Sequence, residues 1–147
     1  MSRDVIISIK PEWVKKIISG EKTIELRKNA PLDPTPFRCF IYVTKDFKPN
    51  RPYSAKLWAS RGKVIGEFVC DLIYLVTPIP AIAEAFSGVS CVSAESIMNY
   101  GGNKMVYGWR ISDLKIYGKP RPLSDFNLRV APQSWCYVNE VHNADNP

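Results

Sequence analysis

The stretch of sequence that says most about the fold is GEKTIELR, which runs from Gly20 to Arg27. Upstream of it, apolar residues recur at helical spacing from Pro11 to Ile18, and a glycine such as Gly20 commonly ends a helix. From Thr23 onward, polar and apolar residues alternate, which is the pattern of a half-buried strand. The stretch therefore predicts the end of a helix, a short turn and the start of a strand.

Charged side chains of this stretch are predicted to converge. Glu25 and Arg27 share one face of the strand, and Lys22 sits at the turn, where its side chain can swing to either side. Arginine suits bidentate contact with phosphate, and glutamate can orient it, accept a hydrogen bond or act as a general base. The same residues also fit an exposed ion pair worth less than about 1 kcal/mol. Both interpretations stay open at this point.

Working outward, further short elements are predicted on both sides of this stretch. The expected strands are Val5–Ile9, Cys39–Val43, one or two strands within Lys63–Val76, Met105–Tyr117 (ended by Pro120 and Pro122) and Trp135–Val138. Short helices are expected at Pro80–Phe86 and Ser93–Tyr100, the latter with Ser93 as N-cap and Gly101 as its stop. Gly66 is expected to mark a bulge or bend, and Lys45–Arg61 to form a long loop.

These elements do not alternate as strand–helix–strand units, which argues against a doubly wound parallel fold. We predict an α+β fold, a small mixed β-barrel of five to six strands with two to three short helices. Its 147 residues fit one domain, which we place at residues 1–138, followed by a polar C-terminal tail at 139–147.

Composition narrows the classes of partner. The formal charge of +6 favours polyanions, because phosphate binding releases counterions. The four cysteines have no metal-ligand spacing and the single histidine, His142, lies in the tail, so we predict neither a metal site nor a cofactor. No segment has the length of a membrane span, and no signal peptide is recognised. We expect a cytoplasmic protein, monomeric by preference and without a membrane partner.

The quoted stretch resembles the signature of the ASCH family, Gly-x-Lys-x-x-Glu-x-Arg. All four fixed positions match, at Gly20, Lys22, Glu25 and Arg27. The later pattern, from Gly62–Phe68 to Tyr107–Ile111, is similar too, so the resemblance covers roughly residues 5 to 118. It implies a PUA-like barrel whose cleft binds RNA or a nucleotide, with Lys22, Glu25 and Arg27 lining that cleft.

Some small bacterial members of the family are amidohydrolases that deacetylate N4-acetylcytidine. The resemblance implies that such an enzyme uses the lysine and a threonine of the motif, together with an acidic residue before the second helix. Lys22 matches the lysine, but Glu25 stands where the threonine is expected. No acid occurs at Gly88–Ser90, although Glu84 or Glu95 could take that place. In a hydrolase, Lys22 would be nucleophile or base and Glu25 its orienting partner or acid–base group.

Further binding residues are predicted from cations and aromatic rings, because single-stranded RNA is bound by stacking and by phosphate pairing. These candidates are Lys10, Arg61, Lys63, Tyr107 and Trp109. Arg61-Gly62-Lys63 could hold a phosphate through backbone N–H groups. Tyr53 and Trp58 accompany several cations in the long loop. The competing interpretation places Trp109 in the core, and Trp13 and Trp135 are expected there as well.

Three functions follow in order of preference. The first is binding of RNA, single-stranded nucleic acid or a nucleotide through a basic cleft. The second is hydrolysis, by an amidohydrolase acting on a modified nucleoside such as N4-acetylcytidine or by a ribonuclease. The third is a protein-interaction or regulatory domain, which would present an exposed apolar patch.

Overall fold

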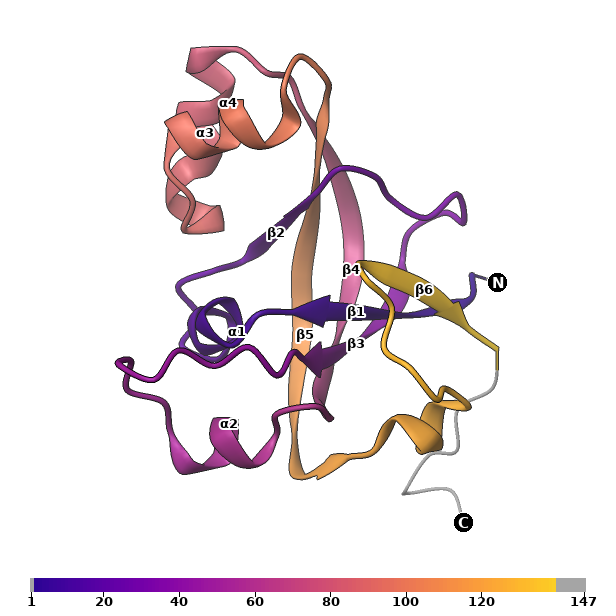
Figure 1. Ribbon diagram of the computed structural model, residues 1–147. Helices are drawn as coiled ribbons and strands as arrows, with labels where there is room; N and C mark the ends of the chain where they lie inside the picture. Colours follow the sequence, from indigo (N-terminus) through magenta and orange to yellow (C-terminus); the bar gives the residue numbers. More distant parts are fainter. Residues whose placement is uncertain (1, 140–147) are drawn as a thin grey trace.

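A computed structural model describes residues 2–139 as one curled sheet with helices along one side (Figure 1). The strands are β1 (Asp4–Ile9), β2 (Ile24–Arg27), β3 (Phe37–Val43), β4 (Val64–Val76), β5 (Val106–Arg121) and β6 (Trp135–Val138). The helices are α1 (Pro11–Ile18), α2 (Ala55–Ala59), α3 (Pro80–Ser90) and α4 (Ala94–Gly101), with a 3₁₀ turn η1 (Leu123–Phe126) before β6.

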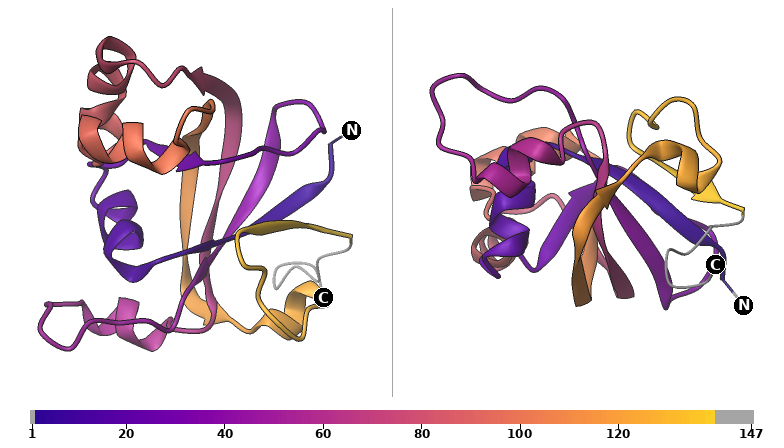
Figure 2. Two further views of the ribbon diagram at one scale, coloured as in Figure 1. Left: turned by 45° about the horizontal axis from the view of Figure 1, so that its top comes forward. Right: turned by 90° about the horizontal axis from the view of Figure 1, so that it is seen from below.

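The six strands form one mixed sheet in the order β2-β5-β4-β3-β1-β6. Only β1 and β3 pair in parallel; the other described neighbours are antiparallel. The long β4–β5 pair spans the molecule, and the sheet curls around α1 into a half-barrel (Figures 1 and 2). The predicted α+β barrel-type fold is confirmed, with β2 and β6 as the two edges of the sheet. The predicted number of two to three short helices was wrong, because the described residues form four, of which α2 was expected to be loop.

The core explains why β1 carries apolar residues at consecutive positions, from Val5 to Ile7. Val5, Ile7 and Ile9 pack with α1 and the inner face of the sheet, whereas Ile6 packs with Phe126 of η1 on the other face. Both faces of β1 are therefore covered, as side chains alternate along a strand. A third cluster lies beneath the α3–α4 hairpin and includes Ile24 and Leu26 of β2. This hairpin thus packs on the face of β2 that carries Ile24 and Leu26, and its ends also reach the opposite face, where Glu25 lies.

Several predicted boundaries were wrong. Residues 45–61 are not all loop, because Ser54 caps α2 by accepting a hydrogen bond from the Leu57 N–H. Helix α3 continues past Phe86 to Ser90. Strand β5 runs through Pro120, which lies in a stretch where the register with β4 shifts, so no ladder N–H is missed there.

Other boundaries were predicted correctly. Ser93 is the N-cap of α4, and its side chain accepts a hydrogen bond from the Ser96 N–H. The predicted tail falls almost wholly outside the described residues. Within residues 2–139, no helix is long and apolar enough to cross a membrane.

Gly66 lies at the irregular start of β4, as predicted for a bulge. A Cβ at this position would lie 2.3 Å from the carbonyl oxygen of Lys115 and 3.1 Å from the Cα of Ile116. Both atoms belong to the neighbouring backbone of β5. The close approach of the two strands therefore requires glycine here.

We predict that Gly66→Ala lowers the free energy of unfolding by about 1–3 kcal/mol, the usual cost of overpacking. The matched control is Gly118→Ala on β5, where an added Cβ would have no atom within 4 Å. Urea unfolding of both variants checks this. Equal midpoints for the two would show that β4 and β5 can separate at no cost.

Candidate functional site

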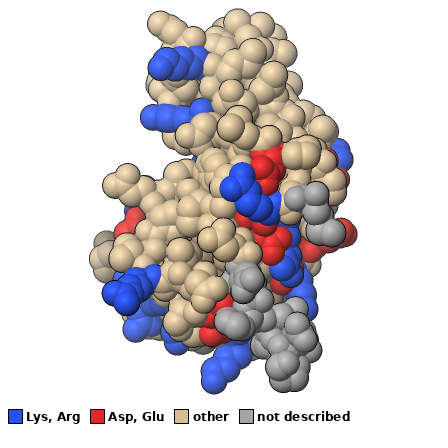
Figure 3. All heavy atoms as spheres, turned by 90° about the vertical axis from the view of Figure 1, so that its right-hand side faces the viewer, with Lys and Arg blue, Asp and Glu red and all other residues tan. Residues whose placement is uncertain are grey.

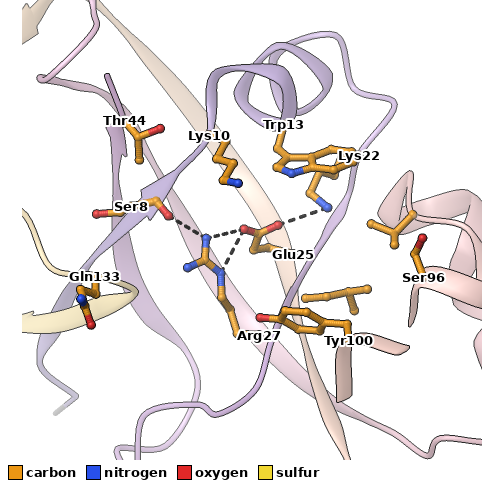
Figure 4. Close-up of a pocket in the computed structure, with 12 residues that line it drawn as sticks. Ser8, Lys10, Trp13, Lys22, Glu25, Arg27, Thr44, Ser96, Tyr100 and Gln133 are labelled. Atoms are coloured by element: carbon orange, nitrogen blue, oxygen red, sulfur yellow. Dashed lines mark hydrogen bonds and ion pairs between the residues drawn. The ribbon is translucent and has the colours of Figure 1, made fainter. Parts of the chain in front are cut away.

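A pocket of about 400 Å³ opens between α1, β2 and α4 (Figure 4). Its floor contains the charged residues of the motif-like stretch, and its walls come from parts of the chain far apart in sequence. The lining residues are Ser8, Lys10, Trp13, Lys22, Glu25, Leu26, Arg27, Thr44, Val92, Ser96, Tyr100 and Gln133. The structure therefore brings together four predicted site residues, namely Lys10, Lys22, Glu25 and Arg27.

Glu25 is the centre of a buried ionic cluster. Its Oε1 lies 3.2 Å from Lys22 Nζ, and its Oε2 accepts hydrogen bonds from Arg27 Nε and Nη2 at 3.1 and 2.7 Å. Glu25 is 4% exposed and Lys22 2% exposed. The exposed ion pair that the sequence also allowed is therefore wrong, because the curled sheet, α1 and the α3–α4 hairpin enclose this face of β2.

Lys22 does not swing freely, as the turn position suggested. Its Nζ donates a hydrogen bond of 2.6 Å to the carbonyl oxygen of Ser90, at the end of α3, and lies 5.1 Å from the centre of the Trp13 ring. A cation at the C-terminal end of a helix also satisfies the negative end of the helix dipole. Lys22 thus ties β2 to α3 while it pairs with Glu25.

Arg27 extends the cluster across the half-barrel. Its Nη2 donates to the carbonyl oxygen of Ser8 in β1 at 2.7 Å, and its Nη1 donates to the side chain of Ser134 at 3.1 Å. Because β2 and β6 are the two sheet edges and Ser134 directly precedes β6, one guanidinium bridges the open side of the barrel.

The two cations control the protonation of Glu25. Burial by itself would raise the pKa of its carboxyl, but the charges of Arg27 and Lys22 outweigh burial and hold that pKa below its ordinary value. Glu25 is therefore an ionised carboxylate near neutral pH. A low pKa makes it a weak general base, and both of its oxygens already accept contacts.

Residues on the pocket walls were in part missed by sequence reasoning. Lys10 and Tyr100 point toward the Glu25–Arg27 pair from opposite sides (Figure 4). Trp13 packs against the core as expected, and its ring also forms part of the pocket wall. Burial raises the pKa of the Tyr100 phenol. Tyr100 had no sequence signal beyond its place in a predicted helix, because only tertiary packing brings α4 to β2.

Arg61 and Lys63 do not line the pocket. The predicted phosphate-binding turn is also wrong, because its N–H groups are already used. Gly62 N donates to the Val43 carbonyl at 2.8 Å, and Lys63 N donates to the Ser60 carbonyl at 3.0 Å. Arg61 instead places its guanidinium 4.5 Å from the centre of the Trp58 ring.

Trp109 is a core residue and not a stacking platform. It is 0% exposed, and its ring packs edge-on against Phe37 and Trp135. It pairs with Glu25 across β2 and β5, while Tyr107 pairs with Arg27. Tyr107 is half-buried against the same core and lies outside the pocket lining. Both rings therefore support the ionic cluster from the neighbouring strand.

The acids considered for an amidohydrolase do not reach the pocket. Glu84 and Glu95 are exposed on α3 and α4, and among the described residues Glu25 is the one carboxylate in the lining. No group of three or more His, Cys, Asp or Glu residues within 2–139 is arranged to hold a metal ion. The arrangement offers charge recognition and hydrogen bonding, with no second carboxylate for paired acid–base chemistry.

Comparison with solved structures identifies the fold. The crystal structure of ASCH from Zymomonas mobilis matches with a TM-score of 0.72 at 22% identity, covering 94% of this chain and 89% of that chain. A crystal structure of a tyrosine-to-phenylalanine mutant of that protein matches with a TM-score of 0.71 at 20% identity, covering 95% and 92%. This chain has the ASCH fold.

Sequence comparison gives a shorter match. The chain is 41% identical over 46 residues to a Zymomonas mobilis protein named ASCH domain-containing ribonuclease. The matched segment covers 31% of this chain and 31% of that protein. No protein-family model matches the sequence. The ASCH fold thus rests on the structural matches over nearly the whole chain.

We predict that Glu25→Gln lowers the free energy of unfolding by about 3 kcal/mol, because it leaves two cations without their buried counter-charge. Glu21→Gln is the control, since Glu21 pairs with Lys16 at the surface and little change is expected. Chemical denaturation at pH 7 measures both. A loss below about 1 kcal/mol for Glu25→Gln would mean that the cluster behaves as an exposed pair.

The same substitution has a predicted pH dependence. The pKa of Glu25 is lower in the folded state, so its contribution is fully present above the unfolded value of about 4.3. That contribution is lost as the pH falls through the folded value. The stability difference between wild type and Glu25→Gln should therefore shrink in acid. Denaturation series from pH 7 down to the acid limit check this, and a constant difference would contradict it.

Proposed function

We propose that this protein binds single-stranded RNA and that the pocket takes one of its nucleotides. The observation that carries the proposal is the composition of the pocket. Its lining holds three cations and one carboxylate, together with the rings of Trp13 and Tyr100. Cations that pair with phosphates and rings that stack on bases are the two features of single-strand recognition.

Within the pocket, the cations have different tasks. Lys22 and Arg27 direct donors to Glu25, Ser90 and Ser8, so they set the local field and hold the floor in place. Lys10 is exposed and forms no ion pair with a described residue, and its amine faces the same space. We assign to Lys10 the contact with a phosphate. All five N–H groups of Arg27 have partners within the protein. Lys22 has three donors and contacts the oxygens of Ser90 and Glu25, so one donor is left for a polar group of the base or sugar.

The size of the pocket favours a single unpaired nucleotide. A volume of about 400 Å³ lies at the lower end of small-ligand sites and has no room for a duplex. Double-stranded RNA is mostly recognised by shape along its grooves, whereas single strands offer bases that can turn into a pocket. We therefore place single-stranded RNA before double-stranded RNA as the ligand.

A ribonuclease is the second candidate, favoured by the 41% identical segment in a protein named as one. In that case Lys22 and Glu25 would act on the scissile group, with Arg27 stabilising negative charge. The low pKa of Glu25 favours a charge-positioning role over that of a base. Binding is placed first for this reason. The pocket offers less support for an amidohydrolase, because Glu84 and Glu95 lie outside it.

We also retain the cytoplasm as the proposed location. All four cysteines are free thiols. Burial raises the pKa of Cys70 to about 12, so this thiol is poorly reactive. Free thiols suit a reducing compartment.

We predict that Lys10→Ala weakens binding of a labelled 12-nucleotide RNA and reduces the salt slope by about one unit, because one phosphate contact is lost. Tyr100→Ala should weaken binding roughly 5- to 150-fold, the range of base–aromatic stacking. Lys119→Ala, an exposed lysine outside the pocket, is the charge-matched control. Fluorescence anisotropy at two salt concentrations measures all three. If both pocket variants bind RNA with wild-type affinity, the pocket is not the RNA-binding site, and the proposal is rejected.

For the ribonuclease candidate, the same RNA is incubated with the protein in EDTA and resolved on a denaturing gel. Cleavage by wild type that is lost in Glu25→Gln, at a temperature where circular dichroism shows the variant folded, supports catalysis. Glu21→Gln, purified in parallel, reveals any contaminating nuclease. If the wild-type protein leaves the RNA intact, the ribonuclease candidate is rejected and only the binding role remains.

A further inference from the structure

A second hollow of about 310 Å³ lies beside α2, in the segment between β3 and β4. Its lining consists of Phe47, Lys48, Pro49, Arg51, Tyr53 and Trp58, none of which lines the first pocket. The hollow thus combines three aromatic rings with two cations. The proposed function gives this hollow no role.

The three rings form an ordered cluster. The ring centre of Phe47 lies 4.7 Å from that of Tyr53 and 5.0 Å from that of Trp58, both in edge-on geometry. The Lys48 N–H donates to the Tyr53 hydroxyl at 3.0 Å. Trp58 nevertheless keeps 49% of its surface exposed, which is unusual for a tryptophan held in place by neighbours. An exposed, oriented ring is a platform for stacking.

Positive charge is concentrated around these rings. Residues 45–63 carry six basic side chains and one acidic one, a net charge of +5 within a protein of +6. The Arg61 guanidinium lies over the Trp58 ring, and Arg51 forms part of the hollow. The right-hand side of the molecule, where β1 begins, mixes acids and bases (Figure 3), with pairs such as Arg3–Asp33 and Arg38–Asp4. The concentration of positive charge therefore makes residues 45–63 the segment best suited to bind a polyanion.

The two hollows are neighbours. Thr44 lines the first and Phe47 the second, so at most about 11 Å separates their Cα atoms. Helix α1 fastens the segment, because Lys15 Nζ donates to the Pro52 carbonyl at 3.2 Å and Lys48 pairs with Glu12 at 3.7 Å. Helices α1, α2 and α4 lie on the same side of the sheet (Figures 1 and 2). Such a separation corresponds to about three stacked nucleotides at 3.4 Å each.

We propose that the second hollow holds a further base of the same RNA strand, stacked on Trp58, with Arg51 and Arg61 contacting its phosphates. This inference rests on the proposed function and deepens it, since the ligand becomes a strand several nucleotides long and not a free nucleoside. The first pocket takes one nucleotide, and the segment at 45–63 guides the strand away from it. Recognition by stacking and phosphate contacts tolerates many sequences.

The test measures the affinity of the full chain for a labelled 12-nucleotide RNA by fluorescence anisotropy. Trp58→Ala is expected to weaken binding roughly 5- to 150-fold, whereas Trp58→Phe, which keeps a ring, should recover most of the affinity. Arg51→Ala should reduce the salt slope by about one unit. Arg129→Ala is the matched control, because it removes the same charge from an exposed position between η1 and β6, outside both hollows, and should leave the slope unchanged.

The outcomes separate the two proposals. Weakening by both Trp58→Ala and Tyr100→Ala, with a larger loss in the double variant, supports one strand in both hollows. Weakening by Tyr100→Ala alone overturns the second site and leaves the proposed function standing. If only Trp58→Ala weakens binding, the proposal that one strand occupies both hollows is rejected, and so is the proposal that the first pocket binds RNA. If Arg51→Ala and Arg129→Ala change the salt slope equally, the segment at 45–63 contributes only non-specific charge and the second site is rejected. If the protein binds no RNA at low salt, both proposals are rejected.

Discussion

The contact of Glu25 with Lys22 and Arg27 is the constraint on which the rest of the site depends. A carboxylate that is 4% exposed is stable there only because two cations compensate the loss of water. Each cation in turn reaches a different part of the protein. Lys22 contacts the end of α3, and Arg27 contacts β1 and the residue before β6. Removing the central charge would therefore disturb the α3–α4 hairpin and the open side of the half-barrel together.

In this arrangement, the buried charged residues stabilise the protein, and the exposed ones are accessible to a ligand. The cluster at the floor of the pocket is committed to the protein itself, so it presents a fixed electrostatic field. Groups on the walls, such as Lys10, Trp13 and Tyr100, have surface left for a ligand. A preorganised floor with accessible walls costs little reorganisation when a ligand enters. The proposed RNA-binding role follows from this division more than from the total charge of the protein.

Sequence reasoning located the floor of the site but, of its walls, only Lys10. The alternation in Ile24–Arg27 correctly separates apolar from charged faces, because the period of a strand is local. It could not reveal that the charged face is buried as well, since α1, α3 and α4 cover it only in the folded chain. Trp13 was assigned to the core for its place on an apolar helix face, yet the end of that face borders the pocket. Trp109 was predicted as a binding residue with the core as the alternative, and its complete burial decides for the core. Arg61 and Lys63 were predicted from their charge and from a phosphate-holding turn, and neither lines the pocket.

By itself, the sequence determined the strands, the N-cap of α4 at Ser93, the α+β class and the residues Lys22, Glu25 and Arg27. These features depend on contacts between neighbours in the chain and on the periodicity of helices and strands. Tertiary structure decided that the ion pair is buried, that Tyr100 faces Glu25 and that the aromatic segment beside α2 lies next to the first pocket. Burial and proximity between distant segments are properties of packing, and no local pattern in one chain encodes them. Helix α2 was predicted as loop for a different reason, because its five residues are too few for a helical period to show.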